Sequence, residues 1–243
     1  MTETYIFDLY GTLVDIHTDE SMPSLWKRMA LLFSLQGAEY ACDELRTAYA
    51  SAIHDQIERR ATLLSGVPAD HVEPDILLVF QSLYEQKGVH LPQEQMQNTA
   101  LIFRMLSMRH IRLYPGAKDV LRELRERRKG VYLLSNAQSA FTMPELRKLG
   151  LSSCFDGVVL SSDVGVKKPD KAIFEYLLSK YRLDPEKCLM IGNDEEADML
   201  GAASVGIAGR YVHTKQSPAR HITLPDTCQE IGSLRDLLLQ WLY

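Results

Sequence analysis

The chain contains no long apolar run, and no stretch of its 243 residues approaches the roughly 20 apolar residues that a bilayer crossing needs. Its four cysteines, Cys42, Cys154, Cys188 and Cys228, lie far apart and form no C-x-x-C pair. That spacing argues against a zinc site and against a redox motif. It favours a reduced, cytosolic setting. There is neither an internal repeat nor a low-complexity tract.

Positive charge is also scarce. Lys and Arg number 27 against 32 Asp and Glu, and the formal net charge is −5. A nucleic-acid partner usually requires a clustered basic face, whereas the richest basic run, residues 122–129, alternates with glutamates like a solvated helix face. Only a few residues separate Met1 from the first apolar segment, so we expect no secretory leader and a cytoplasmic protein. No pattern predicts an oligomeric state.

The residues that are present suit a globular α/β protein. Hydrophobic residues make up 46% of the chain, enough for a full core, and the length allows one large domain or a core with an insert. An apolar, β-prone segment opens the chain at residues 4–7, and a helical spacing of apolar residues without a convincing strand follows over residues 16–112. From Tyr114 onward, helices and strands alternate, which is typical of a parallel sheet with right-handed crossovers.

These patterns predict a doubly wound parallel sheet with an inserted helical domain. The core is assigned to residues 1–15 and 113–243, and the insert to residues 16–112. Within the core we expect strands at residues 131–134, 158–160 and 188–191 and from 206, with helices at 144–149, 173–181, 197–203 and 234–241.

Asp8 is the candidate nucleophile. It ends the first strand and is followed by a turn glycine, Gly11, and by Thr12. Open α/β sheets bind ligands in the crevice at the carboxyl ends of their strands, and an Asp there can attack phosphorus or an activated carbon to form a covalent intermediate. The alternative is that Asp8 only caps a turn.

Three later strand ends carry polar residues. Ser135 and Asn136 follow the second strand of the core and can hold an oxyanion by hydrogen bonds, or act only as a turn and cap pair. Lys168 stands directly before a proline that fixes its backbone direction. Asp194 and Asp198 follow the fourth strand at a spacing of four residues, which brings carboxylates together on one helix face.

The order strand-Asp-x-x-Gly-Thr, strand-Ser-Asn, Lys-Pro and strand-Gly-x-Asp-x-x-x-Asp resembles the haloacid dehalogenase superfamily of hydrolases. The helical insert is similar to that family's C1 type of cap, which closes over small-molecule substrates. The resemblance implies that Asp8 is the nucleophile, that Ser135, Asn136, Gly11 and Thr12 bind the phosphate, and that Lys168 neutralises charge. It also implies a Mg²⁺ held by Asp8, the backbone carbonyl of Tyr10, Asp194 and Asp198. The substrate is then a small anionic molecule, and we expect its selectivity to come from side chains of the cap.

Tyr10 departs from the phosphatase pattern. Most phosphatases of the family carry a second Asp there, which protonates the leaving alcohol, and a tyrosine with a pKa near ~10 is a poor substitute. The dehalogenase branch carries tyrosine at this position, and a halide leaves without a proton. The first motif therefore favours hydrolysis of a 2-haloacid through an aspartyl ester.

The last motif favours phosphatase chemistry instead. The dehalogenases that resemble this chain around Asp8 carry serine at the first acidic position of the last motif. This chain has Asn193 and Asp194 there instead. Two unit charges about 4 to 5 Å apart repel by about 3 to 4 kcal/mol at an effective dielectric constant of ~20, so retained acid favours retained magnesium. We predict a Mg²⁺-dependent phosphatase; the alternatives are a haloacid dehalogenase and a weakly active binding protein. If Asn193 occupies the first acidic position, Asp194 points elsewhere.

Overall fold

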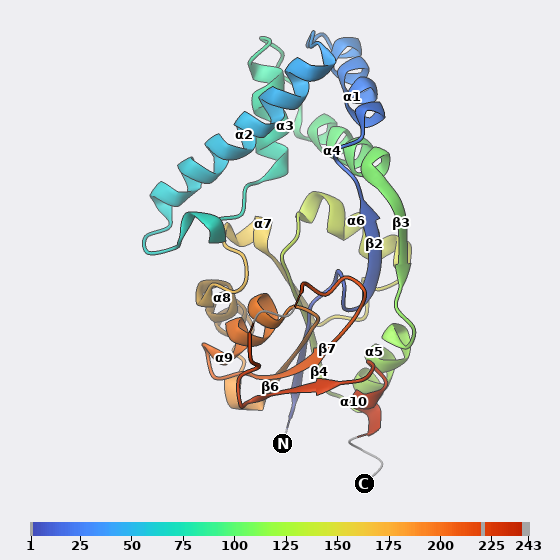
Figure 1. Cartoon of the computed structure of the whole chain (residues 1–243), viewed down its shortest axis with the longest axis vertical. Coiled ribbons are helices and arrows are strands. Elements are labelled where there is room, and N and C mark those ends of the chain that lie inside the picture. Colours follow the sequence, from blue (N-terminus) through green and yellow to red (C-terminus); the bar gives the residue numbers. More distant parts are fainter. Residues whose placement is uncertain (1, 220–221, 240–243) are drawn as a thin grey trace.

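A computed structural model describes residues 2–219 and 222–239, and its lower half is built on a six-stranded parallel sheet (Figure 1). The strand order is β5-β4-β1-β6-β7-β8. The strands are β1 (Thr4–Phe7), β4 (Gly130–Ser135), β5 (Gly157–Leu160), β6 (Cys188–Gly192), β7 (Ala208–Val212) and β8 (Cys228–Ile231). The central strand β1 pairs with β4 and β6, so that Phe7 lies beside Leu133 and Ile191. The α/β class and the parallel sheet predicted from the sequence are confirmed.

Helices cover both faces of this sheet. Side chains alternate across a strand, so Tyr5 and Phe7 enter one hydrophobic cluster, which includes Leu121, while Ile6 enters another, which includes Phe174. The elements around the sheet are α5 (Ala117–Glu126), α6 (Ser139–Leu149), α7 (Ser161–Val164), α8 (Lys171–Tyr181), a 3₁₀ turn η2 (Pro185–Lys187), a π-type turn η3 (Glu195–Leu200), α9 (Gly201–Ala203) and α10 (Asp236–Leu239).

Several predicted bounds of helices and strands differ from the observed ones. Helix α6 begins five residues before the predicted start, and α8 begins at Lys171 behind the capping side chain of Asp170. The predicted strand from residue 206 begins at Ala208. Strand β8 was missed, because its four residues, Cys228–Ile231, include two polar ones and offer little periodicity. The predicted helix at 234–241 is described only as Asp236–Leu239, and its end lies outside the described residues.

The helices α1 to α4 form a separate group, called here the helical region, in the upper half of Figure 1. They are α1 (Pro23–Leu35), α2 (Cys42–Leu63), α3 (Ile76–Glu85) and α4 (Gln93–Ser107), with a 3₁₀ turn η1 (Ala69–His71). Their apolar faces meet in a core of their own that contains Trp26, Phe80 and Phe103. Among the described residues, no helix has the length and apolar character needed to cross a membrane.

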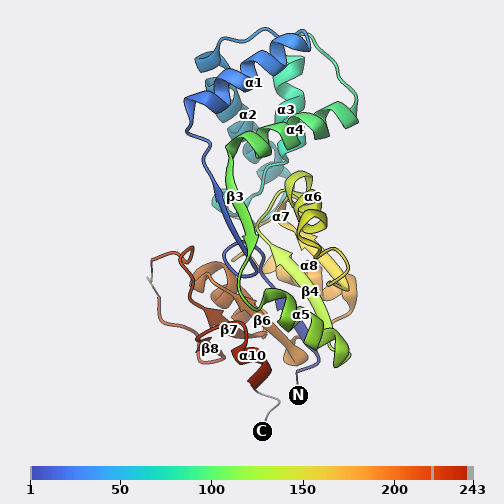
Figure 2. The ribbon, with the colours of Figure 1, turned by 90° about the vertical axis from the view of Figure 1, so that its right-hand side faces the viewer.

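A two-stranded antiparallel ribbon joins the helical region to the sheet (Figure 2). It pairs β2 (Val14–Thr18) with β3 (Met108–Leu113). The expectation that residues 16–112 contain no strand was therefore wrong. Each strand is short and rich in charged residues, and it is stabilised by pairing with a partner about 95 positions away, which no local pattern reveals. Both predicted domain boundaries, 15/16 and 112/113, fall inside this ribbon.

Candidate active site

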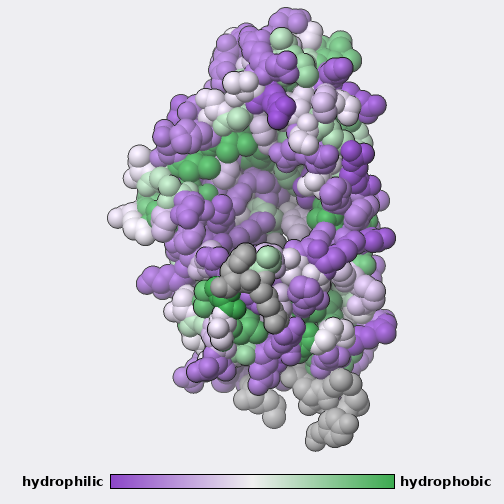
Figure 3. All heavy atoms as spheres, viewed as in Figure 1, coloured by the Kyte–Doolittle hydropathy of each residue, from purple (hydrophilic) through white to green (hydrophobic). Residues whose placement is uncertain are grey.

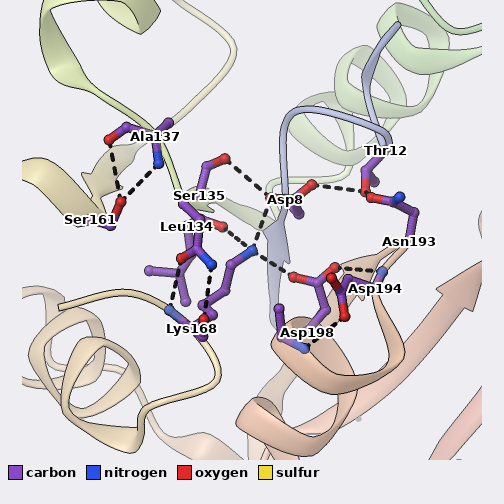
Figure 4. Close-up of polar contacts among 12 residues, drawn as sticks. Asp8, Thr12, Leu134, Ser135, Ala137, Ser161, Lys168, Asn193, Asp194 and Asp198 are labelled. Atoms are coloured by element: carbon purple, nitrogen blue, oxygen red, sulfur yellow. Dashed lines mark hydrogen bonds and ion pairs between the residues drawn. The ribbon is translucent and has the colours of Figure 1, made fainter. Parts of the chain in front are cut away.

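Asp8 lies immediately after β1, at the carboxyl edge of the sheet, and its side chain is buried. Its Oδ1 accepts hydrogen bonds from Ser135 Oγ at 3.1 Å and from Lys168 Nζ at 2.9 Å (Figure 4). Its Oδ2 accepts one from Thr12 Oγ1 at 3.1 Å. Predicted residues from three separate segments thus converge on one carboxylate, as expected for the carboxyl ends of neighbouring parallel strands.

Lys168 is buried with all three ammonium protons engaged. Besides Asp8 Oδ1, its Nζ donates to Asp198 Oδ1 at 2.5 Å and to the Leu134 carbonyl at 3.0 Å. Burial alone would lower the pKa of Lys168, but the charges of Asp198 and Asp8 outweigh it and raise the pKa above its ordinary value. Lys168 therefore stays positively charged beside Asp8, the candidate nucleophile.

Asn136 positions this lysine. Its Oδ1 accepts the Lys168 amide N–H at 2.7 Å, and its Nδ2 donates to the Lys168 carbonyl at 2.9 Å. Both the oxygen and the nitrogen of the Asn136 amide thus bond to the backbone of Lys168, although Asn136 was expected to bind phosphate. Because Asn136 also lines the cavity above Asp8, a contact with substrate stays a prediction.

The turn after Asp8 packs tightly against Asn193. Gly11 has φ +88°, and a Cβ at this position would lie 2.5 Å from Asn193 Nδ2. A left-handed conformation with no room for a side chain requires glycine. Thr12 Oγ1 also lies 3.0 Å from Asn193 Oδ1. The predicted phosphate-binding roles of Gly11 and Thr12 stay predictions, because here these residues shape the nucleophile's loop.

Hydrogen bonds tie the last motif to its own turn and to Lys168. Asp194 Oδ1 accepts the N–H groups of Glu196 and Ala197, so Asp194 caps the η3 turn. Asp198 Oδ2 accepts the Asp194 N–H at 3.0 Å, while its Oδ1 binds Lys168. Asp194 is the N-cap of η3, and both Asp194 and Asp198 line the cavity above Asp8, so their predicted convergence on a metal ion stays a prediction. Buried Asn193 faces the nucleophile's loop.

Burial raises the pKa of Asp198 above the ordinary value for a carboxyl, with Lys168 acting against that shift and the charge of Asp8 adding to it. A Cβ on Gly192 would lie 2.0 Å from Asp198 Oδ2. The glycine at the end of β6 therefore lets the carboxylate of Asp198 lie against the strand and reach Lys168.

The oxygen atoms at this site fit Mg²⁺ better than any softer metal. The described residues contain no cluster of three or more His, Cys, Asp or Glu side chains that could hold a metal ion. Asp198 bonds to Lys168 and to backbone, whereas Asp8, Asn193 and Asp194 also line this cavity of about 160 Å³ with side chains that carry oxygen atoms. Mg²⁺ typically takes one or two carboxylates and keeps several waters, and this set of ligands is sufficient for that.

Tyr10 also lines this cavity, but its hydroxyl is engaged elsewhere. It donates to Glu145 Oε2 at 2.5 Å and lies 2.9 Å from Thr142 Oγ1. Burial, and then the negative charge of Glu145, raise the pKa of Tyr10 well above its ordinary value. Tyr10 is therefore poorly suited to protonate a leaving group. No sequence signal pointed to Thr142 or Glu145, which lie more than 130 positions from Tyr10.

The remaining wall of the cavity comes from the loop after β7. Gln216 and Pro218 line it, and Thr214 Oγ1 donates to the Gly11 carbonyl at 2.8 Å. Lys215 Nζ lies 2.8 Å from Asp15 Oδ2, which ties the loop to the ribbon. The lining residues that the structure describes include none from α1 to α4. The expectation that selectivity comes from side chains of the cap therefore stays a prediction, and Figure 3 shows a largely hydrophilic hollow between the helical region and the sheet.

Asp15 is a buried junction in the ribbon. Burial alone would raise its pKa, but hydrogen bonds from Lys215, His110 and Arg112 outweigh burial and hold the pKa well below its usual range. The Asp15 carboxylate accepts from Arg112 Nε at 2.8 Å and lies 3.1 Å from His110 Nε2. It thus links both ribbon strands to the loop that carries Gln216.

Comparisons with known proteins agree with this geometry. A family model for haloacid dehalogenase-like hydrolases matches residues 2–206. The phosphoserine phosphatase of Thermus thermophilus is 30% identical over 161 residues, 66% of this chain and 63% of that protein. The pyrimidine 5'-nucleotidase YjjG of Escherichia coli is 36% identical over 107 residues, 43% of this chain and 47% of that protein. The chain thus spans about half to just under two-thirds of the length of these relatives.

The fold also resembles that of a solved structure. A 2-haloacid dehalogenase of Pseudomonas syringae has a TM-score of 0.65 at 18% identity, with 99% of this chain and 100% of that one covered. Such a likeness speaks for the fold alone. With the family model matching most of the chain, and with Asp8, Lys168 and Asp198 joined at the carboxyl edge of the sheet, the protein belongs to the haloacid dehalogenase-like hydrolases.

Proposed function

We propose that the protein is a phosphatase that hydrolyses a small phosphorylated metabolite through an aspartyl-phosphate intermediate. The observation that carries the proposal is the pairing of the Asp8 carboxylate with Lys168 and Ser135 beside a cavity of about 160 Å³. One Asp8 oxygen attacks phosphorus in line with the leaving oxygen, a P–O bond to the leaving group breaks, and water then opens the acyl phosphate.

The surrounding side chains divide the work of holding the phosphoryl group. Lys168 offsets negative charge next to Asp8, and Ser135 Oγ and Thr12 Oγ1 are hydroxyl donors within reach of the same carboxylate. A Mg²⁺ held by Asp8, the Tyr10 carbonyl, Asn193 and Asp194 would supply further positive charge for the phosphate oxygens. The two relatives named above are a phosphatase and a nucleotidase, which supports phosphomonoester hydrolysis.

A second candidate, hydrolysis of a carbon–halogen bond, is favoured by one specific observation. Tyr10 donates its proton to Glu145, and a halide needs no proton to leave. Against it stands Asp194, whose carboxylate lines the cavity and repels a haloacid anion. A weakly active binding protein is the third reading, and the presence of a paired nucleophile, Asp8, argues against it.

The test is release of product from two generic substrates. We expect Mg²⁺-dependent phosphate release from p-nitrophenyl phosphate that EDTA abolishes, and no halide release from 2-chloropropionate. Halide release insensitive to EDTA would support the dehalogenase instead, and no turnover of either substrate would contradict the phosphatase proposal. The cytoplasmic location and the helical region's role as a cap stay part of this proposal.

A further inference from the structure

A buried ion pair joins the helical region to the loop of the nucleophile. Arg104, on α4, donates from Nε to Glu145 Oε1 at 2.7 Å, and Glu145, on α6, accepts the hydroxyl of Tyr10. Tyr10 stands two positions after Asp8 and lines the cavity above it. Three segments far apart in sequence therefore meet in one chain of contacts, from the helical region to the catalytic loop.

This chain of contacts is held rigidly. Arg104 is 14% exposed and Glu145 7%, so water screens the pair weakly. The Arg104 guanidinium also lies 5.5 Å from the ring centre of Tyr10 and 5.1 Å from that of Phe141. Cation–π contacts on two sides and a carboxylate on a third leave the guanidinium little freedom. Through Glu145, its position therefore bears on the hydroxyl of Tyr10.

The location of the Arg104–Glu145 pair couples this pair to motion of the helical region. Helix α4 ends at Ser107 and runs directly into β3 of the ribbon. Phe141 of α6 belongs to the hydrophobic cluster of the helical region, whereas Leu146 of the same helix belongs to a cluster of the sheet. A shift of α4 relative to α6 would therefore pull Arg104 away from Glu145 and release Tyr10.

The geometry points to Arg104 as a positioning residue that acts through Glu145 on Tyr10, so that the catalytic loop is ordered only when the helical region is seated. This inference rests on the proposed function, because it concerns the same Asp8. It predicts that Arg104 does not bind substrate, since it is not among the residues lining the cavity above Asp8. It also predicts that Arg104 matters only while Tyr10 has a hydroxyl to hold.

A double-mutant cycle in steady-state kinetics tests both statements. With p-nitrophenyl phosphate and Mg²⁺, we expect Arg104→Gln to lower kcat about tenfold and to leave KM within about twofold, because a displaced catalytic loop impairs the reaction rather than binding. Tyr10→Phe should lower kcat by a similar factor. In the Tyr10→Phe background, Arg104→Gln should cost less than about threefold, because the contact it acts through is already gone.

Arg109→Gln is the matched control. Arg109 lies on β3 of the ribbon, is 56% exposed and pairs with Asp19 at 3.8 Å. The kinetics of Arg109→Gln should therefore match those of the wild type. If Arg104→Gln fails to fold, Glu145→Gln takes its place, because it removes the charge yet keeps an amide oxygen for Tyr10; the same non-additivity is expected. Thermal unfolding of every variant checks that the fold is kept.

The outcomes are distinct. Independent effects that multiply, or a raised KM with unchanged kcat, would overturn the inference and make Arg104 a structural or a substrate-binding residue. Inactivity of the wild type towards p-nitrophenyl phosphate would refute the proposed function itself, and the inference with it. Activity in the wild type that is lost in Asp8→Asn, together with additive effects at Arg104 and Tyr10, would refute the inference alone.

Discussion

Removal of the Lys168 ammonium should separate the structural role of this residue from its chemical role. Lys168→Met replaces a buried cation by an apolar side chain of similar length and leaves Asp8 and Asp198 facing each other without a counter-ion. Breaking a buried ion pair by removing one partner costs about 3–5 kcal/mol. We expect the free energy of unfolding at pH 7 to fall by about that amount.

A second substitution, Asp198→Asn, tests whether the unpaired carboxylate causes the loss of stability. Asp198→Asn in the Lys168→Met background removes the unpaired carboxylate, and it should recover more than half of the lost stability, because only Asp8 then stays charged. The double variant should nevertheless stay inactive, since the charge that offsets the phosphoryl group is gone. Urea unfolding followed by circular dichroism measures the stability, and phosphate release measures the activity.

The pH dependence follows from the pKa of Asp198. That pKa is already raised to about 7, with Lys168 acting against the rise, so it increases further in Lys168→Met. A carboxyl whose pKa is higher in the folded than in the unfolded state binds its proton on folding, and stability falls as the pH rises above about 4. The single variant should therefore be more stable at pH 5 than at pH 8.

Lys167→Met is the control, because the neighbouring side chain is only half-buried; we expect a change within about 0.5 kcal/mol. The reasoning fails if Lys168→Met unfolds like the wild type, or if Asp198→Asn does not rescue it.

Other substitutions test the remaining parts of the site. Asp8→Asn should reduce phosphate release by more than about 10³-fold with unchanged circular dichroism, since the nucleophile is lost. Gly11→Ala should lower the free energy of unfolding in urea by about 1–3 kcal/mol, because of its left-handed φ and the contact with Asn193. Asp15→Asn should cost about 1–2 kcal/mol at pH 7; the difference should shrink as the pH falls from about 4 towards the lowered pKa of Asp15, where the folded-state carboxyl is protonated too. Because Tyr10 donates to Glu145, kcat/KM for an aryl phosphate should exceed that for an alkyl phosphate by at least about 10²-fold. Equal rates for the two esters would mean that a proton donor acts at the leaving group.

The predicted residues that the structure brings together share a local signal. Asp8, Ser135 and Lys168 stand beside strand ends or a helix-opening segment, and the parallel sheet brings such positions to one edge. Each was therefore predictable from a few neighbouring residues and the helix–strand alternation.

The features that were missed depend on distant partners or on backbone detail. The ribbon of β2 and β3 exists only as a pair, and Arg104, Glu145 and Tyr10 meet across at least 40 positions. In the last motif, Asp194 caps the η3 turn while Asn193 contacts Thr12 of Asp8's loop. A spacing of four residues is compatible with several such turns, so it could not decide among them.

The charges around Asp8 explain why an amide at position 193 suits the proposed phosphatase chemistry. Lys168 is bonded to both Asp8 and Asp198, so this cluster holds two carboxyl groups and one cation. A carboxylate in place of the Asn193 amide would add a charge beside Thr12, and each further repulsion at about 4 to 5 Å costs about 3–4 kcal/mol. Asn193 keeps an oxygen for a cation without adding that charge. Substitution by Asp should therefore tighten Mg²⁺ binding, because a third carboxylate attracts the ion, while it weakens binding of a phosphate ester in Mg²⁺-free buffer. Titrations of Mg²⁺ and of inorganic phosphate measure the two effects separately, and a variant that binds both more tightly would contradict this account of the site's charge.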